Sequence, residues 1–346
     1  MIDRKLSVFA AHFSYAGNGG FSSITPDIRT WWATTLKEMK ADQRIERVYE
    51  ADFIDTPITM TRNAAVIAAR SVKADLLLMV DSDMRPDSRL ARDANARPFW
   101  STAFDFIHER YEQGPNLVFA PYCGMPPNEC VFVFRWHRPA SSTNTDTTGM
   151  SLEMYGREEA AQKSGIEPVA AGPTGLILFD MRLFELTDPS KAVEDLVAKG
   201  VPRYAAQRMV LSWFDYEFAD IWHSRKASTE DVVSTRDMSL TCQSLLGYNP
   251  VHCAWDCWAG HWKPVCVDRP KILTTDEISE KYRHALATNH KAGETVRHVV
   301  AHGLEKLAKR NAADFVAETL ASPEPKFGRD WLAKDAPCDA ETAPPY

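Results

Sequence analysis

The chain of 346 residues is 45% hydrophobic and 25% charged, and it carries a formal net charge of −7 at pH 7. This composition is typical of a globular protein with a sizeable core, and the acidic balance argues against tight nonspecific binding to DNA or to an anionic membrane. No apolar stretch approaches the roughly 20 residues of a membrane span, and seven cysteines without a CxxC pair fit a reducing compartment. We therefore expect a soluble, cytoplasmic protein that contacts no membrane.

The first half of the chain alternates apolar strand patterns with amphipathic helix patterns. We predict strands at 6–13, 45–53 and 75–83 and helices at 25–42 and 56–74. The last of these strands is too apolar to be half exposed, so we expect it to be central in the sheet and parallel to its neighbours. The order of elements predicts a doubly wound, mostly parallel α/β sheet with right-handed crossovers.

The middle of the chain is less regular. A helix at 99–114 and a strand at 116–122 continue the pattern. Residues 129–136 alternate between apolar and polar, which indicates an edge strand or one arm of a hairpin. The 167–180 segment is predicted as one strand interrupted by glycines, which allow a ligand to approach closely or the backbone to take unusual angles.

The end of the chain differs from the rest. From residue 274 onward the pattern is helical, and the last residues are a proline-rich coil. We therefore predict an α/β domain at 1–272 and a helical C-terminal extension at 273–346 that ends in coil.

Two aspartates end the most apolar of the predicted strands. In LLLMVDSDM (76–84), Asp81 and Asp83 are separated only by Ser82. Ligands bind at the carboxyl ends of the strands in doubly wound sheets, so these acids lie where a ligand site is expected. Carboxylate oxygens suit Mg²⁺ and Mn²⁺, which also leave room for substrate phosphates. The alternative interpretation is a solvated surface turn, because D-x-D also occurs in ordinary loops.

A second pair of acids opens a helical pattern. In KASTEDVVSTRDM (226–238), Glu230 and Asp231 precede the helix-forming residues. Acids in the first turn of a helix are stabilised by its dipole, so a purely structural role is the alternative to a catalytic one.

A histidine and a lysine follow in a tryptophan-rich stretch. In CAWDCWAGHWKPV (253–265), His261 comes after a glycine and Lys263 two residues later. Imidazole is a good ligand for a borderline cation, and lysine is a good partner for phosphate. Two alternatives are a hydrogen-bonded histidine among tryptophans and a structural zinc site. The zinc site would use His252, Cys253, Cys257 and His261, although the spacing of its cysteines is unusual.

In their order along the chain, these motifs resemble those of GT-A fold nucleotide-sugar glycosyltransferases, of the family-2 type and of small phage-encoded relatives. The matching stretches are TRNAAVIAA (61–69), LLLMVDSDM (76–84), AAGPTGLILFD (170–180), TEDV (229–232) and AGHWK (259–263). The resemblance covers about residues 5–268 and leaves the helical extension uncovered. It implies a GT-A, Rossmann-like α/β fold with a mostly parallel sheet flanked by helices.

The resemblance also implies roles for single residues. The metal, Mn²⁺ or Mg²⁺, would be held by Asp81, Asp83 and His261. The donor, a UDP- or GDP-sugar, would be contacted by Arg62, Asp81, Ser82, Gly172, Gly175 and Lys263. Asp231 would be the general base of an inverting reaction, with Glu230 as the less favoured choice.

These roles imply a metal-dependent glycosyltransferase that moves a sugar to an acceptor hydroxyl. A divalent cation and a lysine stabilise a departing diphosphate, and a carboxylate takes the proton of the acceptor. The acceptor would be a glycan, a protein or a hydroxylated base in DNA, which would make the reaction a DNA modification. Two alternatives stay open, a nucleotidyltransferase and a catalytically inactive module that binds a sugar nucleotide or a glycan. Arginines that follow the acids form either a solvated basic face or a site for an acceptor phosphate: Arg85, Arg89, Arg92 and Arg97.

Overall fold

The computed structural model describes residues 4–14, 26–54, 57–124, 129–137, 151–220, 225–263 and 265–267. Contacts within the chain divide it into two units, Met1–Ile272 and Leu273–Tyr346. The predicted helical extension lies in the second unit, outside the described residues, so it stays a prediction. Among the described residues, no helix combines the length and the apolar character needed to cross a membrane.

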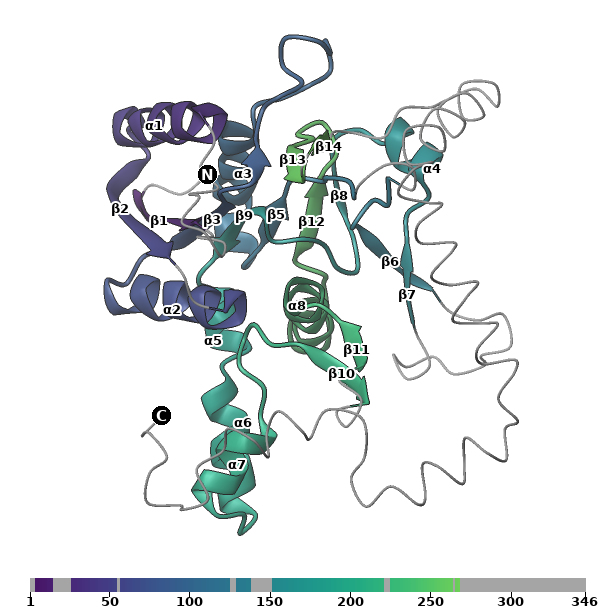
Figure 1. The fold of residues 1–346 in the computed structure, drawn as a ribbon. Helices are drawn as coiled ribbons and strands as arrows, with labels where there is room; N and C mark the ends of the chain where they lie inside the picture. Colours follow the sequence, from purple (N-terminus) through teal and green to yellow (C-terminus); the bar gives the residue numbers. More distant parts are fainter. Residues whose placement is uncertain are drawn as a thin grey trace, which may run out of the picture. The chain divides into compact units, whose positions relative to one another are not determined.

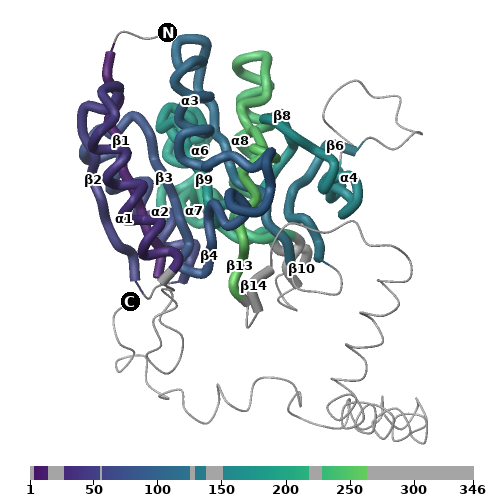
Figure 2. Tube along the Cα trace, turned by 90° about the horizontal axis from the view of Figure 1, so that it is seen from above, coloured from purple at the N-terminus to yellow at the C-terminus, as the bar shows by residue number. Residues whose placement is uncertain are grey.

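The centre of the fold is a seven-stranded sheet with the strand order β2-β1-β3-β9-β5-β12-β8. In that order, the strands are Ile45–Ile54, Leu6–Ser14, Leu76–Asp81, Leu176–Asp180, Leu117–Phe119, Val251–Ala254 and Ile166–Pro168. Strands β2, β1 and β3 are parallel, as are β5 and β12, whereas β9 and β8 run antiparallel to their neighbours. Figure 2 shows β2, β1, β3 and β9 following one another across the sheet. The predicted Rossmann-like α/β class, with a mostly parallel sheet flanked by helices, is confirmed.

Helices cover both faces of this sheet (Figure 1). One face packs against α1 and α3, and the other against α2, α5 and α8. These helices are Pro26–Ala41, Phe99–Arg110, Ile58–Ser71, Arg182–Leu186 and Glu230–Leu246, in the order just named. Successive side chains of a strand point to opposite faces, so in β3 Leu76 and Leu78 belong to the first layer and Leu77 and Met79 to the second. The uniformly apolar sequence of β3 therefore follows from its burial on both sides.

The sequence prediction of a single interrupted strand at 167–180 is wrong. The structure has two separate strands there, β8 and β9, and β9 lies antiparallel between β3 and β5. Strand β3 is thus central, as predicted, but of its two neighbours only β1 is parallel to it, since β9 is antiparallel. The buried connection between β8 and β9 passes close to β5, since a Cβ atom added to Gly172 would lie 2.0 Å from Cζ of Phe119. Glycine is needed here for packing space.

The remaining elements lie outside the central sheet. A short three-stranded sheet joins β14 (Val265–Val267), β13 (Gly260–Lys263) and β4 (Met84–Arg85). Strands β6 (Phe134–His137) and β7 (Ser151–Met154) pair antiparallel, as the hairpin alternative for 129–136 predicts. The predicted helix 99–114 is α3 extended by the 3-10 turn η1 (Tyr111–Gln113). Other elements that the sequence analysis did not predict, besides α5, β4, β12, β13 and β14, are α4 (Arg157–Gln162), α6 (Pro189–Ala198), α7 (Arg203–Met209), β10 (Glu217–Asp220) and β11 (Arg225–Ser228).

Candidate active site

The acidic turn lies between β3 and β4, at the carboxyl end of the parallel strands. Asp81 is the last residue of β3, and its backbone N–H donates a hydrogen bond to the carbonyl of Gly175 at 2.8 Å. The backbone N–H of Ser82 donates to the carbonyl of Phe13 in β1, also at 2.8 Å. These two bonds connect the turn to β1 and to Gly175, which directly precedes β9. Ser82, between the two acids, is itself buried.

His261 is brought to this turn by strand pairing. In the antiparallel pair of β13 and β4, His261 lies opposite Met84, and the backbone N–H of Trp262 donates to the carbonyl of Asp83 at 2.7 Å. The Nε2 atom of His261 consequently lies 3.1 Å from Oδ2 of Asp83, across 178 residues of sequence. The predicted approach of Asp83 and His261 is therefore present in the structure. Figure 2 shows β4 and β13 close together at the same edge.

Arg62 connects the acidic turn to the second pair of acids. This residue of α2 is 3% exposed. Its Nη2 group donates to Oδ2 of Asp81 at 2.8 Å, and its Nη1 group donates to Oε1 of Glu230 at 2.6 Å. Burial disfavours a charged guanidinium, but the charges of Asp81 and Glu230 outweigh burial and raise the pKa of Arg62. Arg62 thus remains a cation that binds two acids from distant parts of the chain.

The start of α8 supplies two acids with different surroundings. Glu230 is 6% exposed and bound by Arg62, and burial raises the pKa of its carboxyl group. Asp231 is only partly buried. Its Oδ1 atom accepts hydrogen bonds from the Thr229 hydroxyl and from the backbone N–H of Val232, the latter at 2.8 Å. The structural interpretation of these acids therefore holds in part, because Asp231 binds the backbone at the helix start.

The carboxylates form one electrostatic cluster. Burial raises the pKa of Asp81, Arg62 opposes that rise, and the negative charges of Asp83 and Asp231 add to it. The negative charge of Asp231 also raises the pKa values of Glu230 and Tyr122. The site therefore gathers several acids around one buried arginine.

Tyr122 is a site residue that the sequence analysis missed. It follows β5, its ring contacts His261 with a centroid distance of 4.7 Å, and a Cβ atom added to Gly175 would lie 3.1 Å from its hydroxyl oxygen. Burial, together with the charges of Asp231 and Asp81, raises the pKa of Tyr122 well above its usual value. The phenol therefore stays protonated. Its place after a buried strand was the available signal, because β5 ends at the same edge as β3.

Two of the other predicted site residues, Gly172 and Gly175, are packed against protein groups. Gly172 is buried, and it exchanges hydrogen bonds with the hydroxyl of Thr235 in α8, accepting at 2.9 Å and donating at 3.0 Å. Gly175 lies beside Tyr122 and Met84. Lys263 occupies the last position of β13, and its side chain lies outside the described part of the structure. The donor contacts implied for these residues stay predictions.

The metal prediction also remains untested. In the described part of the chain, no group of three or more histidine, cysteine or acidic side chains is arranged to hold a metal ion. Asp83 and His261 approach each other, whereas Asp81 directs Oδ2 to Arg62. The other oxygen of Asp81, Oδ1, is buried and accepts no hydrogen bond from the described residues. Carboxylate oxygens are ligands that Mn²⁺ and Mg²⁺ prefer, so the two aspartates match such an ion in chemistry, whereas the described side chains do not form a complete ligand set.

The alternative zinc site is not formed. His252 directs Nδ1 to the carbonyl of Pro250 at 2.9 Å. Cys253 and Cys257 are buried free thiols, and burial raises the pKa of both, to about 12 for Cys257. No three of the four predicted zinc ligands, all of which lie in the described part of the chain, are grouped so that they could hold a metal ion, so these two cysteines are core residues. Trp255 and Trp258 are also in the core, at 0% and 2% exposure.

Comparison with known proteins gives only distant likenesses. No protein-family model matches the chain, and a search of curated proteins found no match. Among solved structures, the chain is similar to A197 from STIV, with 11% sequence identity, a TM-score of 0.36, and coverage of 78% of this chain and 96% of that chain. HddC from Yersinia pseudotuberculosis, complexed with GMP-PN, is 9% identical with a TM-score of 0.25, over 52% of this chain and 79% of that one. A protein described as a glucose-1-phosphate thymidylyltransferase from Bacillus anthracis, in complex with a sucrose, is 9% identical with a TM-score of 0.27, over 52% of this chain and 75% of that one.

Proposed function

We propose that the protein is a transferase that moves a sugar from a nucleoside diphosphate to the hydroxyl group of an acceptor. One observation carries this proposal: the acidic turn, His261 and the acids of α8 converge at the carboxyl end of the parallel strands. Such an edge is where α/β sheets of this kind bind ligands. The paired acids suit a donor that carries phosphates and a divalent cation.

Asp83 and His261, with Oδ1 of Asp81, are the residues that would hold Mn²⁺ or Mg²⁺. When bound, such an ion supplies positive charge that stabilises the departing diphosphate. Ser82 keeps the turn in place through its bond to Phe13. Lys263, two positions after His261 on β13, is the proposed second source of positive charge at the diphosphate.

Asp231 is the proposed general base. Glu230 is buried and its carboxylate is bound to Arg62, whereas Asp231 is partly exposed at the helix start. In the proposed step, the acceptor oxygen forms a bond to the anomeric carbon of the donor sugar. The bond from that carbon to the diphosphate oxygen breaks, and the electron pair leaves with the nucleoside diphosphate. The acceptor proton passes to Asp231. Because the acceptor attacks the anomeric carbon in one step, from the side opposite the leaving diphosphate, the transfer inverts the configuration of that carbon.

A screen with sugar nucleotides tests this proposal. UDP- and GDP-sugars are added with and without Mn²⁺, melting temperature is measured, and the products of turnover are separated. A ligand that binds only the folded state raises the melting temperature, so we expect stabilisation that needs Mn²⁺ and is lost in Asp83→Ala. Release of nucleoside diphosphate supports the proposal, release of pyrophosphate indicates a nucleotidyltransferase, and binding without turnover indicates an inactive binding module. Absence of binding by all these donors contradicts the proposal.

A further inference from the structure

Arg62 and Asn63 are neighbours on α2 and bind three separate segments of the chain. Arg62 joins Asp81, at the end of β3, to Glu230, at the start of α8. Asn63 binds the backbone of Phe214 twice, since its Nδ2 group donates to the carbonyl at 2.8 Å and its Oδ1 atom accepts from the N–H at 3.2 Å. Phe214 precedes β10 and α8 in the sequence. Arg62 and Asn63 thus connect α2 to the end of β3, to the start of α8 and to the segment that precedes β10.

The burial of Arg62 leaves little of it for a ligand. Both terminal nitrogens already bind acids, and the residue is 3% exposed. A donor diphosphate could reach those nitrogens only by displacing Asp81 or Glu230. This displacement would leave a buried carboxylate without a partner, which is costly. The geometry therefore favours a role toward protein groups over direct contact with the donor.

The two acids bound by Arg62 are each next to a residue of the proposed reaction. Asp81 belongs to the turn that carries Asp83, and Glu230 directly precedes Asp231. The rigid fork of arginine can bind two carboxylates at once at fixed separation, which the single ammonium group of lysine cannot reproduce. The distance between the acidic turn and the first turn of α8 is consequently set through one guanidinium.

We propose that Arg62 is a positioning residue, which holds the base-bearing start of α8 against the acidic turn through Glu230 and Asp81. This inference rests on the proposed function for its catalytic meaning. It assigns Arg62 a different role from the donor contact that the family resemblance implies. In this role Glu230 accepts the hydrogen bond from Arg62, and Asp231 remains the proposed base.

Hydrogen exchange and kinetics on Arg62→Lys test the proposal together. Without any substrate, we expect faster exchange of the backbone amides at 230–236 in Arg62→Lys than in the native protein, because the lysine loses one of the two acids. With a sugar nucleotide that the native protein turns over, we expect kcat to fall about 100-fold, the order of loss that follows a misplacement of about 1 Å. The donor KM should stay within about threefold, since ground-state binding is not what changes.

Two further variants separate this role from simpler ones. Arg70→Lys is the matched control, because Arg70 lies on the same helix and pairs with Asp188 at 2.9 Å away from the cluster; it should change neither exchange at 230–236 nor kcat. Glu230→Gln should reproduce the faster exchange of Arg62→Lys, and the double variant should be no worse than Arg62→Lys alone, because the two residues act as one contact. Loss of turnover in Glu230→Gln with native exchange would instead make Glu230 the base.

The proposal is overturned if Arg62→Lys raises the donor KM with unchanged kcat and unchanged exchange, which is the behaviour of a donor ligand. A fall in kcat with unchanged exchange also overturns it, because Arg62 would then act on the reacting groups directly. If the native protein turns over no sugar nucleotide while exchange responds to Arg62→Lys, the contact stands and only the proposed function fails.

Discussion

The two edges of the central sheet use arginines and acids in different ways. At the edge opposite the site, Asp180 is fully buried and binds Arg182 through both oxygens, the shortest contact being 2.6 Å. Asp75 likewise uses both oxygens, one for Arg4 at 2.5 Å and one for Ser7 at 2.8 Å. The guanidinium carbon of Arg182 lies 3.9 Å from the centroid of the Tyr111 ring, and that of Arg4 lies 5.1 Å from the same centroid. The acids and arginines at this edge therefore bind one another.

At the site edge, by contrast, some buried polar atoms are not paired within the described part of the chain. Among the described residues, Oδ1 of Asp81, Nε of Arg62 and Nδ1 of His261 are buried atoms without a hydrogen-bond partner. Buried polar groups are normally paired, because each unpaired one costs free energy. The charged side chains at the opposite edge thus pair with one another, whereas several buried polar atoms at the site edge have no partner among the described residues. Substitutions of single residues test this difference between the two edges.

The largest effect is expected at Asp231. We expect Asp231→Asn to lower the turnover of a sugar nucleotide about 1000-fold, since general base catalysis contributes that order of rate. Thermal stability and the Mn²⁺-dependent binding of UDP or GDP should remain native, because the amide keeps the shape of the side chain. Asp195→Asn, at an exposed acid of α6, serves as the control. A turnover of Asp231→Asn close to native would exclude Asp231 as the base.

The next largest effect is expected at Asp180, at the edge opposite the site. We expect Asp180→Ala to lower the free energy of unfolding by about 3 kcal/mol, because Arg182 loses its buried partner and its charge-assisted hydrogen bonds. Urea unfolding measures this loss. Turnover per folded molecule should not change, since Asp180 lies at the opposite edge. A variant with native stability would show that this network does not stabilise the fold.

Gly172→Ala tests the tight passage between β8 and β9. An added Cβ atom would lie 2.0 Å from Cζ of Phe119, so we expect a loss of about 2 kcal/mol from overpacking. Gly156→Ala is the matched control, because a Cβ atom there meets nothing within 4 Å; its effect should stay within about 0.5 kcal/mol. Equal stabilities of the two variants in urea unfolding would contradict the packing role of Gly172.

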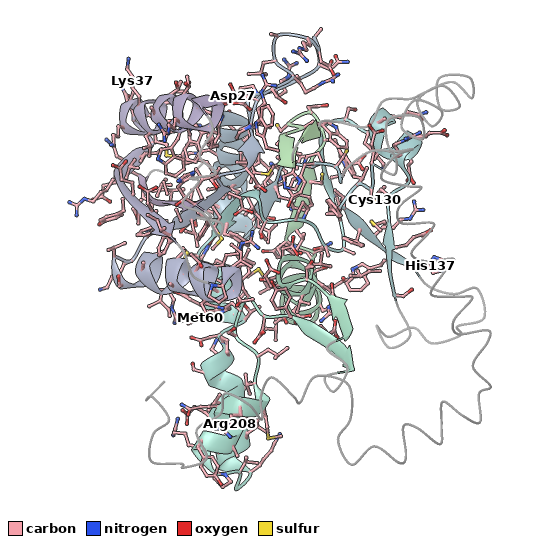
Figure 3. The ribbon with its side chains drawn as sticks, viewed as in Figure 1. Asp27, Lys37, Met60, Cys130, His137 and Arg208 are labelled. Carbon is pink, nitrogen blue, oxygen red and sulfur yellow. The ribbon has the colours of Figure 1, made fainter. Side chains whose placement is uncertain are left out.

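A smaller effect of opposite sign is expected at the site edge. The charge of Asp83 raises the pKa of Asp81, which reports repulsion between the two acids. In metal-free solution, Asp83→Asn should therefore stabilise the fold by about 1 kcal/mol, as substitutions at functional sites often do. Addition of Mn²⁺ should then no longer raise the melting temperature. Asp27, which is labelled in Figure 3, lies in the first turn of α1 and pairs with Arg85 at 3.1 Å. The variant Asp27→Asn should keep the response to Mn²⁺.

The smallest effect concerns pH and His252. Burial lowers the pKa of this imidazole below its ordinary value of about 6.5. As pH falls through that value, the unfolded state takes up a proton before the folded state does, so stability falls as the solution is acidified. Asn replaces the donor at Nδ1 without titrating, so His252→Asn should lose less stability between pH 7 and pH 5 than the native protein. Parallel loss in both proteins would show that His252 does not contribute.

The sequence predicts the elements that depend on local pattern. Strands β1, β2 and β3 and helices α1 and α2 follow from apolar periodicity, and the place of Asp81 at the end of β3 follows from their order. The position of β9 does not follow, because its insertion between β3 and β5 depends on packing between distant segments. For the same reason, the contact of Arg62 with Glu230, across 168 residues, is not visible in the sequence. His261 is expected near Asp83 only through the family resemblance.

The pairing of β13 with β4 has a consequence for how this protein tolerates change. Backbone register, with Gly260 opposite Arg85 and His261 opposite Met84, delivers the imidazole to Asp83. The connection between β12 and β13 is itself mostly buried. An insertion or deletion there that moves the pairing by one residue would turn the histidine to the other face. We expect natural and engineered variants of this chain to tolerate changes in the length of this connection poorly.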